Sequence, residues 1–184
     1  MPAFPRSELE EMVERWLQVN REAEAKGDWT DMIAMYTPDA TYGWNYGPNE
    51  DFMTVGRDEI RDVALGLEMG GLDGWEYPYQ KVLIDDQQGE VLGFWKQIAT
   101  TPRPDGGTYE VAGFGGSWFR YAGSFQWSWQ RDFFDVGNAT ALFIQMFRDD
   151  TLSDGMKRRL DVASSGAPQP CRYPVGQAPV GLWD

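Results

Sequence analysis

The hydrophobic period of the chain changes near residue 75, and this change constrains the fold more than any other feature. Before that point, apolar residues recur at helical spacing. Beyond it lie four long segments of β-strand type, separated by turns that contain glycine: 75–85, 89–100, 108–121 and 125–136. Consecutive strands joined by tight turns form an antiparallel meander. The sequence therefore predicts an α+β domain with helices gathered in front of a sheet.

Two of the three predicted N-terminal helices precede the first strand. The first spans 7–26, and Ser7 and Glu10 within it form a capping-box pair. Asp28 caps a short second helix, which Pro38 stops because proline cannot continue a helix. The order helix, short helix, strand is therefore predicted for the first 46 residues.

A short strand region and a third helix complete the part before the meander. A strand is predicted over 39–46, a turn over 47–49 and an extended segment over 51–55. The third helix opens at 56–60 and closes at a pair of glycines, Gly70–Gly71. Its predicted apolar face consists of Ile60, Val63, Ala64 and Leu67.

The sheet is predicted to bend, and a proline-rich segment ends the chain. Gly113, Gly115 and Gly116 inside the third long strand favour a bulge, as a cone-shaped sheet requires. Helices are predicted at 138–149 and 153–163. The following residues, 164–184, hold four prolines, which forbid a regular helix. They form either a disordered tail or an ordered arm laid over a neighbour. We divide the chain into a domain at 1–163 and an arm at 164–184.

The chain contains no histidine and one cysteine, which narrows the possible chemistry. Ser-His-Asp and Cys-His catalysis, His-ligated zinc and a disulfide framework are excluded. Any catalysis must use carboxylates, lysine, arginine, tyrosine or amides, and no metal or cofactor is predicted. A net charge of −13 disfavours nucleic acid and anionic membranes as partners. Without an apolar run of membrane-spanning length or a signal segment, a cytoplasmic location is expected.

Four motifs in order carry a resemblance to a known superfamily. They are 26–29 (KGDW), 36–42 (YTPDATY), 55–60 (VGRDEI) and 129–135 (WQRDFFD). With these motifs, the chain resembles the nuclear transport factor 2-like superfamily, in particular its SnoaL-like branch, over residues 8–150. The resemblance implies a cone-shaped sheet wrapped on three N-terminal helices, a deep apolar pocket between them, and a homo-oligomer (dimer or trimer). It does not imply one function.

Two groups of enzymatic relatives match this chain only in part. Ketosteroid isomerases carry an aspartate base at a position that falls near Trp44 here, and their oxyanion donors fall near Asn20 and Ser117. Scytalone-type and bile-acid dehydratases place a histidine near Lys81, so that the lysine would have to replace it. The isomerase reaction is therefore disfavoured, and a dehydratase stays an alternative.

A third group keeps one important residue. Limonene-type epoxide hydrolases use an aspartate on the last strand, kept here as Asp132, and Asn45 resembles their water-holding asparagine. Their Arg-x-Asp pair is replaced by 95–97 (WKQ). A narrower similarity is to the cofactor-independent diarylpropane lyases of lignin-degrading bacteria, which release formaldehyde from a 1,2-diaryl-1,3-diol to give a stilbene. It rests on overall similarity, the proline-rich C-terminus and the abundant aromatic residues.

Strand alternation sorts the candidate catalytic residues by face. Lys81 shares a face with Tyr77, and a lysine that faced the pocket would be desolvated and basic. Asp132 lies on the face that the resemblance places toward the pocket. The predicted catalytic base is Asp132 or Lys81. Tyr42 or Tyr46, together with Asn45, is predicted to act as the acid and to hold the substrate oxygen. The predicted substrate-binding residues are Trp44, Tyr79, Trp95, Gln97, Ser117 and Trp118.

Each candidate also has a purely structural interpretation. Asp132 could pair with an arginine or a backbone amide, and Lys81 could point to water. Asn45 and Tyr46 could be turn residues, the aromatic residues could be core, and Arg158–Arg159 is expected on a solvated face. The function predicted from these residues is a cofactor-free lyase on a bulky hydrophobic aromatic substrate. A dehydratase, an epoxide hydrolase and a non-catalytic binding domain are the alternatives.

Overall fold

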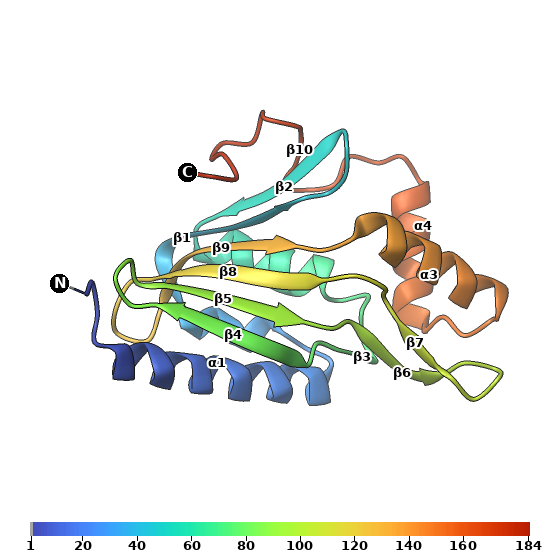
Figure 1. Cartoon of the computed structure of the whole chain (residues 1–184). Coiled ribbons are helices and arrows are strands. Elements are labelled where there is room, and N and C mark those ends of the chain that lie inside the picture. The colour runs from blue at the N-terminus through green and yellow to red at the C-terminus, as the bar shows by residue number, and fades with distance from the viewer. Residues whose placement is uncertain (1) are drawn as a thin grey trace.

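A curved sheet wraps around the N-terminal helices, as the sequence predicted (Figure 1). The computed structural model describes residues 2–184. The main sheet has the order β10-β2-β1-β9-β8-β5-β4, with every neighbouring pair antiparallel except the parallel pair β1 and β9. Its strands are β1 (Tyr36–Asn45), β2 (Glu50–Val55), β4 (Tyr79–Asp85), β5 (Glu90–Trp95), β8 (Gly115–Tyr121), β9 (Trp127–Phe133) and β10 (Arg172–Pro174).

A smaller sheet and two helices close one end of the molecule (Figure 1). The small sheet has the order β3-β6-β7, with β3 at Trp75–Glu76, β6 at Ile98–Pro102 and β7 at Thr108–Glu110. The helices are α1 (Arg6–Lys26), η1 (Thr30–Met35), α2 (Arg57–Glu59), η2 (Ile60–Glu68), α3 (Val136–Arg148) and α4 (Asp154–Ser164). Residues of the small sheet pack with α3 and α4 in a second hydrophobic core, around the buried Trp75, Tyr109 and Met146.

Three of the four predicted long strands are each broken into two. The first breaks between β3 and β4 at Pro78, which cannot donate a backbone hydrogen bond. The third breaks between β7 and β8, where Gly113 has a φ of +102°. A Cβ on Gly115 would overlap the ring of Trp95, so glycine lets that ring lie against the strand. The predicted bend is therefore confirmed. In addition, β3, β6 and β7 are separated from the main sheet and form a second sheet.

Helix α1 matches its predicted range, but its predicted capping box is wrong. Pro5 precedes the first turn, so Ser7 already lies inside the helix and makes no cap. Glu10 instead accepts a hydrogen bond from Arg6 Nε at 3.0 Å. Gly27 ends the helix in the left-handed conformation with a φ of 67°, which an ordinary L-residue adopts with strain.

Strand β1 begins three residues earlier than predicted, and this changes the site. The short helix η1 has 3₁₀ geometry and ends at Met35, and Tyr36 opens the strand. Pro38 lies inside β1, where the pairing with β9 is irregular between Tyr36 and Thr41. Tyr36 is therefore a strand residue that faces the helices. The adjacent segment β2 matches its prediction within one residue.

The third helix has a different buried face from the predicted one. After the short turn α2, the chain forms the π-helix η2, whose hydrogen bonds reach one residue further than those of an α-helix. Leu65 and Glu68 are consequently buried, whereas Leu67 is 47% exposed. The predicted face was right for Ile60 and Ala64 and wrong for Leu67.

The arm at 164–184 is ordered against the sheet of its own chain (Figure 1). Its strand β10 pairs antiparallel with β2, with Arg172 opposite Phe52. Further along, Arg131 Nε donates to the carbonyl oxygen of Leu182 at 3.0 Å, and Trp129 Nε1 to that of Asp184 at 2.6 Å. Of the two interpretations of the tail, the structure supports an ordered arm.

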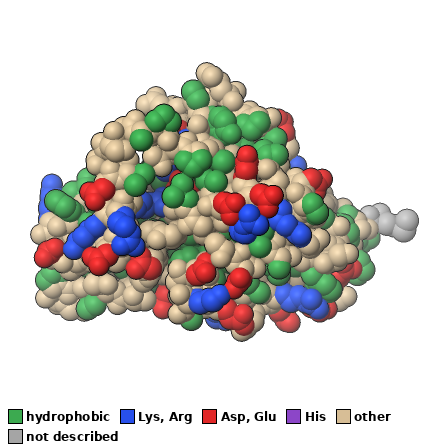
Figure 2. All heavy atoms as spheres, turned by 180° about the vertical axis from the view of Figure 1, so that it is seen from behind, with side chains coloured by type: hydrophobic (Ala, Val, Ile, Leu, Met, Phe, Trp, Pro, Cys, Tyr) green, Lys and Arg blue, Asp and Glu red, His purple; other side chains and the backbone are tan. Residues whose placement is uncertain are grey.

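The surface carries charges of both signs. Figure 2 shows lysine and arginine interspersed with aspartate and glutamate on the face seen from behind. Among residues 2–184, no helix combines the length and the hydropathy that crossing a bilayer demands.

Candidate functional site

A cavity of about 560 Å³ lies between the helices and the inner face of the sheet. Its volume is within the range of pockets that bind small molecules. Helices α1, η1 and η2, strands of the main sheet, and α3 and α4 all contribute lining residues. Its aromatic lining consists of Trp16, Trp29, Tyr36, Tyr42, Trp44, Tyr46, Tyr77, Tyr79, Trp95, Phe134, Phe143 and Phe147.

Asp132 is the carboxylate at the centre of one polar group in this cavity. Strand β9 places it between Trp44 of β1 and Ser117 of β8. The Tyr42 hydroxyl donates to Asp132 Oδ2 at 2.5 Å, and Gln130 Nε2 donates to Oδ1 at 2.8 Å. The structural interpretation of Asp132 as the partner of an arginine is therefore wrong, because its direct hydrogen bonds come from a phenol and an amide.

Burial raises the pKa of Asp132, although hydrogen bonds from Gln130, Tyr42 and Ser117 and the charge of Arg131 oppose this. A carboxylate in this state is a stronger base than aspartate in water. Its position in an apolar cavity and its hydrogen bonds thus fit a general base held in a fixed orientation.

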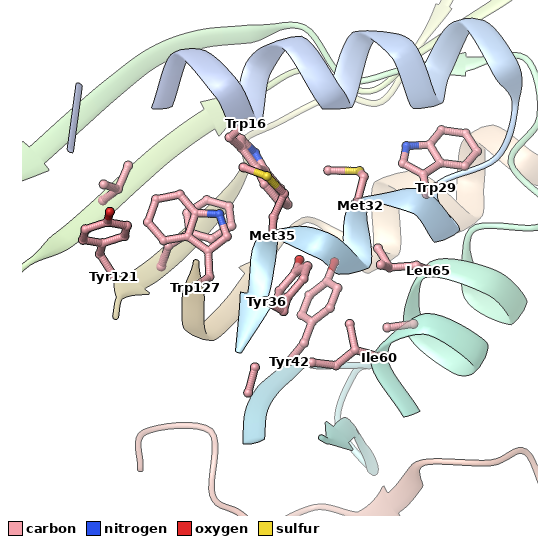
Figure 3. Close-up of a cluster of buried hydrophobic side chains, with 14 of the residues drawn as sticks. Trp16, Trp29, Met32, Met35, Tyr36, Tyr42, Ile60, Leu65, Tyr121 and Trp127 are labelled. Carbon is pink, nitrogen blue, oxygen red and sulfur yellow. The ribbon is translucent and has the colours of Figure 1, made fainter. Parts of the chain in front are cut away.

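Tyr36 extends this polar group away from the carboxylate. Its hydroxyl donates to Gln130 Oε1, and its ring stacks on that of Tyr42 with the centroids 6.3 Å apart. Figure 3 shows the hydroxyls of the two tyrosines pointing the same way. Burial, and then the negative charge of Asp132, raise the pKa of both phenols well above their usual value. Both tyrosines are therefore protonated in the resting protein, where they act as hydrogen-bond donors.

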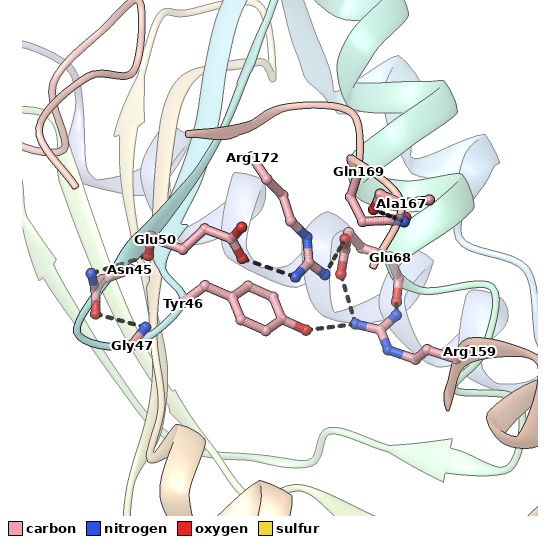
Figure 4. A network of polar contacts seen from close by, with 9 residues as sticks. All are labelled: Asn45, Tyr46, Gly47, Glu50, Glu68, Arg159, Ala167, Gln169 and Arg172. Atoms are coloured by element: carbon pink, nitrogen blue, oxygen red, sulfur yellow. Dashed lines mark hydrogen bonds and ion pairs between the residues drawn. The ribbon is translucent and has the colours of Figure 1, made fainter. Parts of the chain in front are cut away.

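A second polar group lies at the end of β1, around Tyr46 (Figure 4). Arg159 donates to the Tyr46 hydroxyl at 3.0 Å and to Glu68 Oε2 at 2.6 Å. Arg172 donates to Glu68 Oε1 at 2.8 Å and to Glu50 at 3.1 Å, and its guanidinium lies 4.0 Å from the centre of the Tyr46 ring. Tyr46, Glu68 and Arg159 all line the cavity.

The arginines of this group keep their charge. Burial works against the charged form of Arg159, but the combined effect of Tyr46 and Glu68 raises its pKa overall. The prediction that Arg158–Arg159 forms a solvated face was wrong for Arg159, whose side chain is only 22% exposed. Helix α4 turns this residue toward the cavity, and Glu68 of η2 pairs with it.

Five of the predicted substrate-binding residues line the cavity: Trp44, Tyr79, Trp95, Gln97 and Ser117. Most of their polar side-chain atoms have partners within the wall, whereas the buried Trp44 Nε1 has none. Trp95 Nε1 donates to Ser117 Oγ at 3.0 Å, and Trp16 Nε1 donates to the Tyr79 hydroxyl, also at 3.0 Å. These contacts hold the rings in place, so the wall is a preformed aromatic surface.

Three predicted site residues lie outside the cavity wall, either because they are on the other face of their strand or because the register of the strand shifts. Lys81 is exposed because the register of β4 shifts between Tyr79 and Lys81, which puts these two residues on opposite faces. Asn45 points away from the Tyr42 face and bonds to Asp51 and Gly47 in the turn. Trp118 lies on the outer face, where its Nε1 donates to Glu90 at 2.9 Å.

The sequence reasoning missed residues whose partners are distant in the chain. Gln130 shares a strand face with Asp132, but nothing in the pattern indicated that it would link this carboxylate to Tyr36. Glu68 and Arg159 are 91 residues apart and meet only because η2 and α4 face each other. The one available signal was the position of Glu68 beside the apolar residues of a predicted helix.

Comparisons with solved structures agree on the fold. An NTF2-like protein from Anabaena variabilis ATCC 29413 matches with a TM-score of 0.53 at 14% identity, covering 73% of this chain and 95% of that one. A steroid delta-isomerase from Pseudomonas aeruginosa gives 0.53 at 13% identity, covering 90% and 100%. A putative SnoaL-like polyketide cyclase from Jannaschia sp. CCS1 gives 0.51 at 17% identity, covering 71% and 90%.

No protein-family model matches the chain, and no curated protein matches it in sequence. The chain thus has the nuclear transport factor 2-like fold that its motifs predicted. At these identities the likeness shows the fold alone, so the function has to be argued from the residues of the cavity.

Proposed function

We propose that the protein is a cofactor-free enzyme that acts on a bulky hydrophobic aromatic substrate by general acid–base catalysis. One observation carries the proposal. The carboxylate of Asp132 lines an aromatic cavity, where burial raises its pKa and Tyr42 and Gln130 fix its orientation. The solved structures of the same fold include proteins named as a steroid isomerase and a putative polyketide cyclase, which supports an enzymatic role.

The specific reaction that we propose is the cleavage of a 1,2-diarylpropane-1,3-diol to a stilbene, formaldehyde and water. Asp132 removes the proton of the terminal hydroxyl, and the bond between the terminal and the adjacent carbon breaks to release formaldehyde. The electron pair of that bond forms the new carbon–carbon double bond as the benzylic hydroxyl departs. Tyr42 donates the proton that makes this leaving group water, and protonated Asp132 returns a proton to Tyr42.

The cavity supports this chemistry in two ways. Asp132 can accept a proton and Tyr42 can donate one, and the two groups are already in contact. The reaction therefore needs no imidazole, which this chain lacks. The apolar wall excludes water, and this strengthens electrostatic interactions with a developing charge. Trp44 and Trp95 offer aromatic faces on which the substrate rings can stack.

A non-catalytic binding domain is the second candidate, because most of the cavity wall is aromatic and several of its polar atoms, such as Trp95 Nε1 and the Tyr79 hydroxyl, already have internal partners. Epoxide hydrolysis is less well supported. Asn45, the candidate for holding the attacking water, points away from the cavity into a turn. The residues at 95–97 also provide no arginine to hold an epoxide oxygen.

The test is incubation with a panel of 1,2-diarylpropane-1,3-diols, followed by a formaldehyde assay and ultraviolet detection of stilbene. Asp132→Asn should reduce turnover by about 10²-fold or more, because the base is lost. Asp58→Asn, at a carboxylate whose side chain is 87% exposed, is the matched control and should keep full activity. Circular dichroism checks the fold of both variants. Binding without product in the wild type would favour the second candidate.

A further inference from the structure

The second polar group of the cavity has an unused hydrogen-bond donor. The Tyr46 hydroxyl accepts a hydrogen bond from Arg159 at 3.0 Å, so its own hydrogen is free to donate. Among residues 2–184, no acceptor for that hydrogen is present. The two oxygens of Glu68 accept hydrogen bonds from Arg159 and Arg172 and none from Tyr46. A phenol in this position can satisfy its donor only with a ligand or water in the cavity.

The surroundings of Tyr46 hold this donor in place. Its backbone N–H donates to Glu50 at 2.8 Å, which closes the turn between β1 and β2. The guanidinium of Arg172 covers the ring, and Arg159 contacts the hydroxyl oxygen (Figure 4). Since Arg172 comes from β10, the C-terminal arm itself helps to orient the phenol. A donor held in this way loses little conformational freedom on binding.

The charges of the group indicate what kind of acceptor it can take. Two guanidinium groups, from Arg159 and Arg172, face two carboxylates, from Glu50 and Glu68. The positive charges are therefore already paired, and none is left to balance an anion. A neutral oxygen, such as a phenolic hydroxyl or an aryl ether, fits the free donor better than a carboxylate or a phosphate does.

The donor and Asp132 belong to separate polar groups of the same cavity. Tyr42, which contacts Asp132, and Tyr46 are four residues apart and both line the cavity, with Trp44 between them. A strand rises about 3.3 Å per residue, so their Cα atoms are about 13 Å apart. The cavity thus has two polar groups along one aromatic wall.

We infer that Tyr46 is a specificity-determining residue that binds a neutral acceptor oxygen on the part of an aromatic substrate remote from Asp132. Arg159 and Arg172 are positioning residues for this phenol. The inference rests on the proposed function in one respect, namely that the cavity takes an aromatic substrate. It goes beyond that proposal because it specifies a second oxygen that the substrate must carry.

Binding of unreactive probes tests this inference without any turnover. The probes are bibenzyl, 4-hydroxybibenzyl, 4-methoxybibenzyl and 4-carboxybibenzyl, and the readout is quenching of tryptophan fluorescence. The wild type should bind the hydroxyl and methoxyl probes about five- to tenfold more tightly than bibenzyl, as one added hydrogen bond allows. Tyr46→Phe should remove this preference and leave the affinity for bibenzyl unchanged. Tyr173→Phe, outside the cavity wall, is the matched control and should keep the preference.

Several results would overturn the inference. A preference that survives in Tyr46→Phe, or a wild type that binds all neutral probes equally, would show that Tyr46 does not select the oxygen. Tighter binding of 4-carboxybibenzyl than of 4-hydroxybibenzyl would indicate an anion site instead. If Tyr46→Phe does not fold, the wild type alone provides the test. The comparison is then between 4-hydroxybibenzyl and 4-methoxybibenzyl, because a methoxyl group can accept but cannot donate a hydrogen bond. Loss of affinity on methylation would then contradict the inference.

The same experiment separates this inference from the proposed reaction. If the preference depends on Tyr46 while no diol is cleaved, the oxygen site stands and the lyase reaction fails. If diols are cleaved but Tyr46→Phe keeps the preference, the reaction stands and the inference fails. If no bibenzyl probe binds, both fail, because the cavity then does not accept an aromatic ligand.

Discussion

Removing the Tyr42 hydroxyl should shift the pH at which Asp132 works as a base. The hydrogen bond from Tyr42 to Asp132 Oδ2, at 2.5 Å, stabilises the ionised carboxylate and lowers its pKa against the effect of burial. Tyr42→Phe removes this donor and leaves the ring in place. The pKa of Asp132 should therefore rise further in the variant.

The magnitude follows from the strength of one hydrogen bond to a charged group. Such a bond contributes about 1.5–3 kcal/mol, and about 1.4 kcal/mol corresponds to one pH unit, so the pKa should rise by about 1–2 units. A base must be ionised to act, so activity is lost as the pH falls through its pKa. Because Tyr42 is also the proposed acid, kcat/KM should fall at every pH in Tyr42→Phe, and the acidic limb of the remaining activity should move up by about 1–2 pH units.

The assay is the pH dependence of product formation for the wild type, Tyr42→Phe and a control. Tyr121→Phe is the control because its hydroxyl bonds to Glu8, away from the cavity, so its acidic limb should coincide with that of the wild type. An acidic limb that does not move in Tyr42→Phe would refute the reasoning, since Asp132 would then not be the titrating base.

Three further predictions concern stability and the corrected site. Burial raises the pKa of Asp132 in the folded state, so the stability of the wild type falls as pH rises from the unfolded value, about 4, to the folded one. Asp132→Asn should therefore be more stable than the wild type above that pH window, and the difference in melting temperature should shrink toward pH 4. A difference that does not depend on pH would contradict this. Gly115→Ala should cost about 1–3 kcal/mol in urea unfolding because its Cβ would overlap the Trp95 ring, whereas Gly137→Ala in α3 should cost less, since its Cβ would meet only the Asp135 carboxylate at 3.3 Å. Lys81→Ala should keep turnover within about twofold of the wild type because Lys81 is exposed, and a loss of activity comparable to that of Asp132→Asn would return it to the site.

Local patterns predicted the elements of the fold but not where they break. The helical spacing over 7–26 and the glycine turns correctly indicated α1 and the meander β4-β5-β8-β9. Pro78 and Gly113 mark two of the breaks, but the partners of the separate pieces depend on contacts across the sheet, because β3, β6 and β7 pair only with one another. Periodicity within one strand contains no information about such pairing.

The site shows the same division between local and distant information. The family resemblance placed the Asp132 face of β9 toward the cavity, and Asp132 does line it. The alternation of β9 holds there because no irregularity interrupts its pairing with β8 between residues 129 and 133. In β4 a single register shift puts Lys81 on the opposite face from Tyr79, and no residue type in the sequence predicts that shift. The hydrogen bonds of the group around Tyr46 join residues up to 122 positions apart, which only the folded chain brings together.

The most direct test of the account is a measurement of the pKa of Asp132 in the folded protein. Carboxyl ¹³C chemical shifts followed by NMR over a pH titration give this value, and the signal absent in Asp132→Asn identifies the residue. A midpoint above the value of about 3.9 for an unperturbed aspartate is the predicted result. A midpoint at or below that value would contradict the claim that Asp132 is a desolvated base in the cavity.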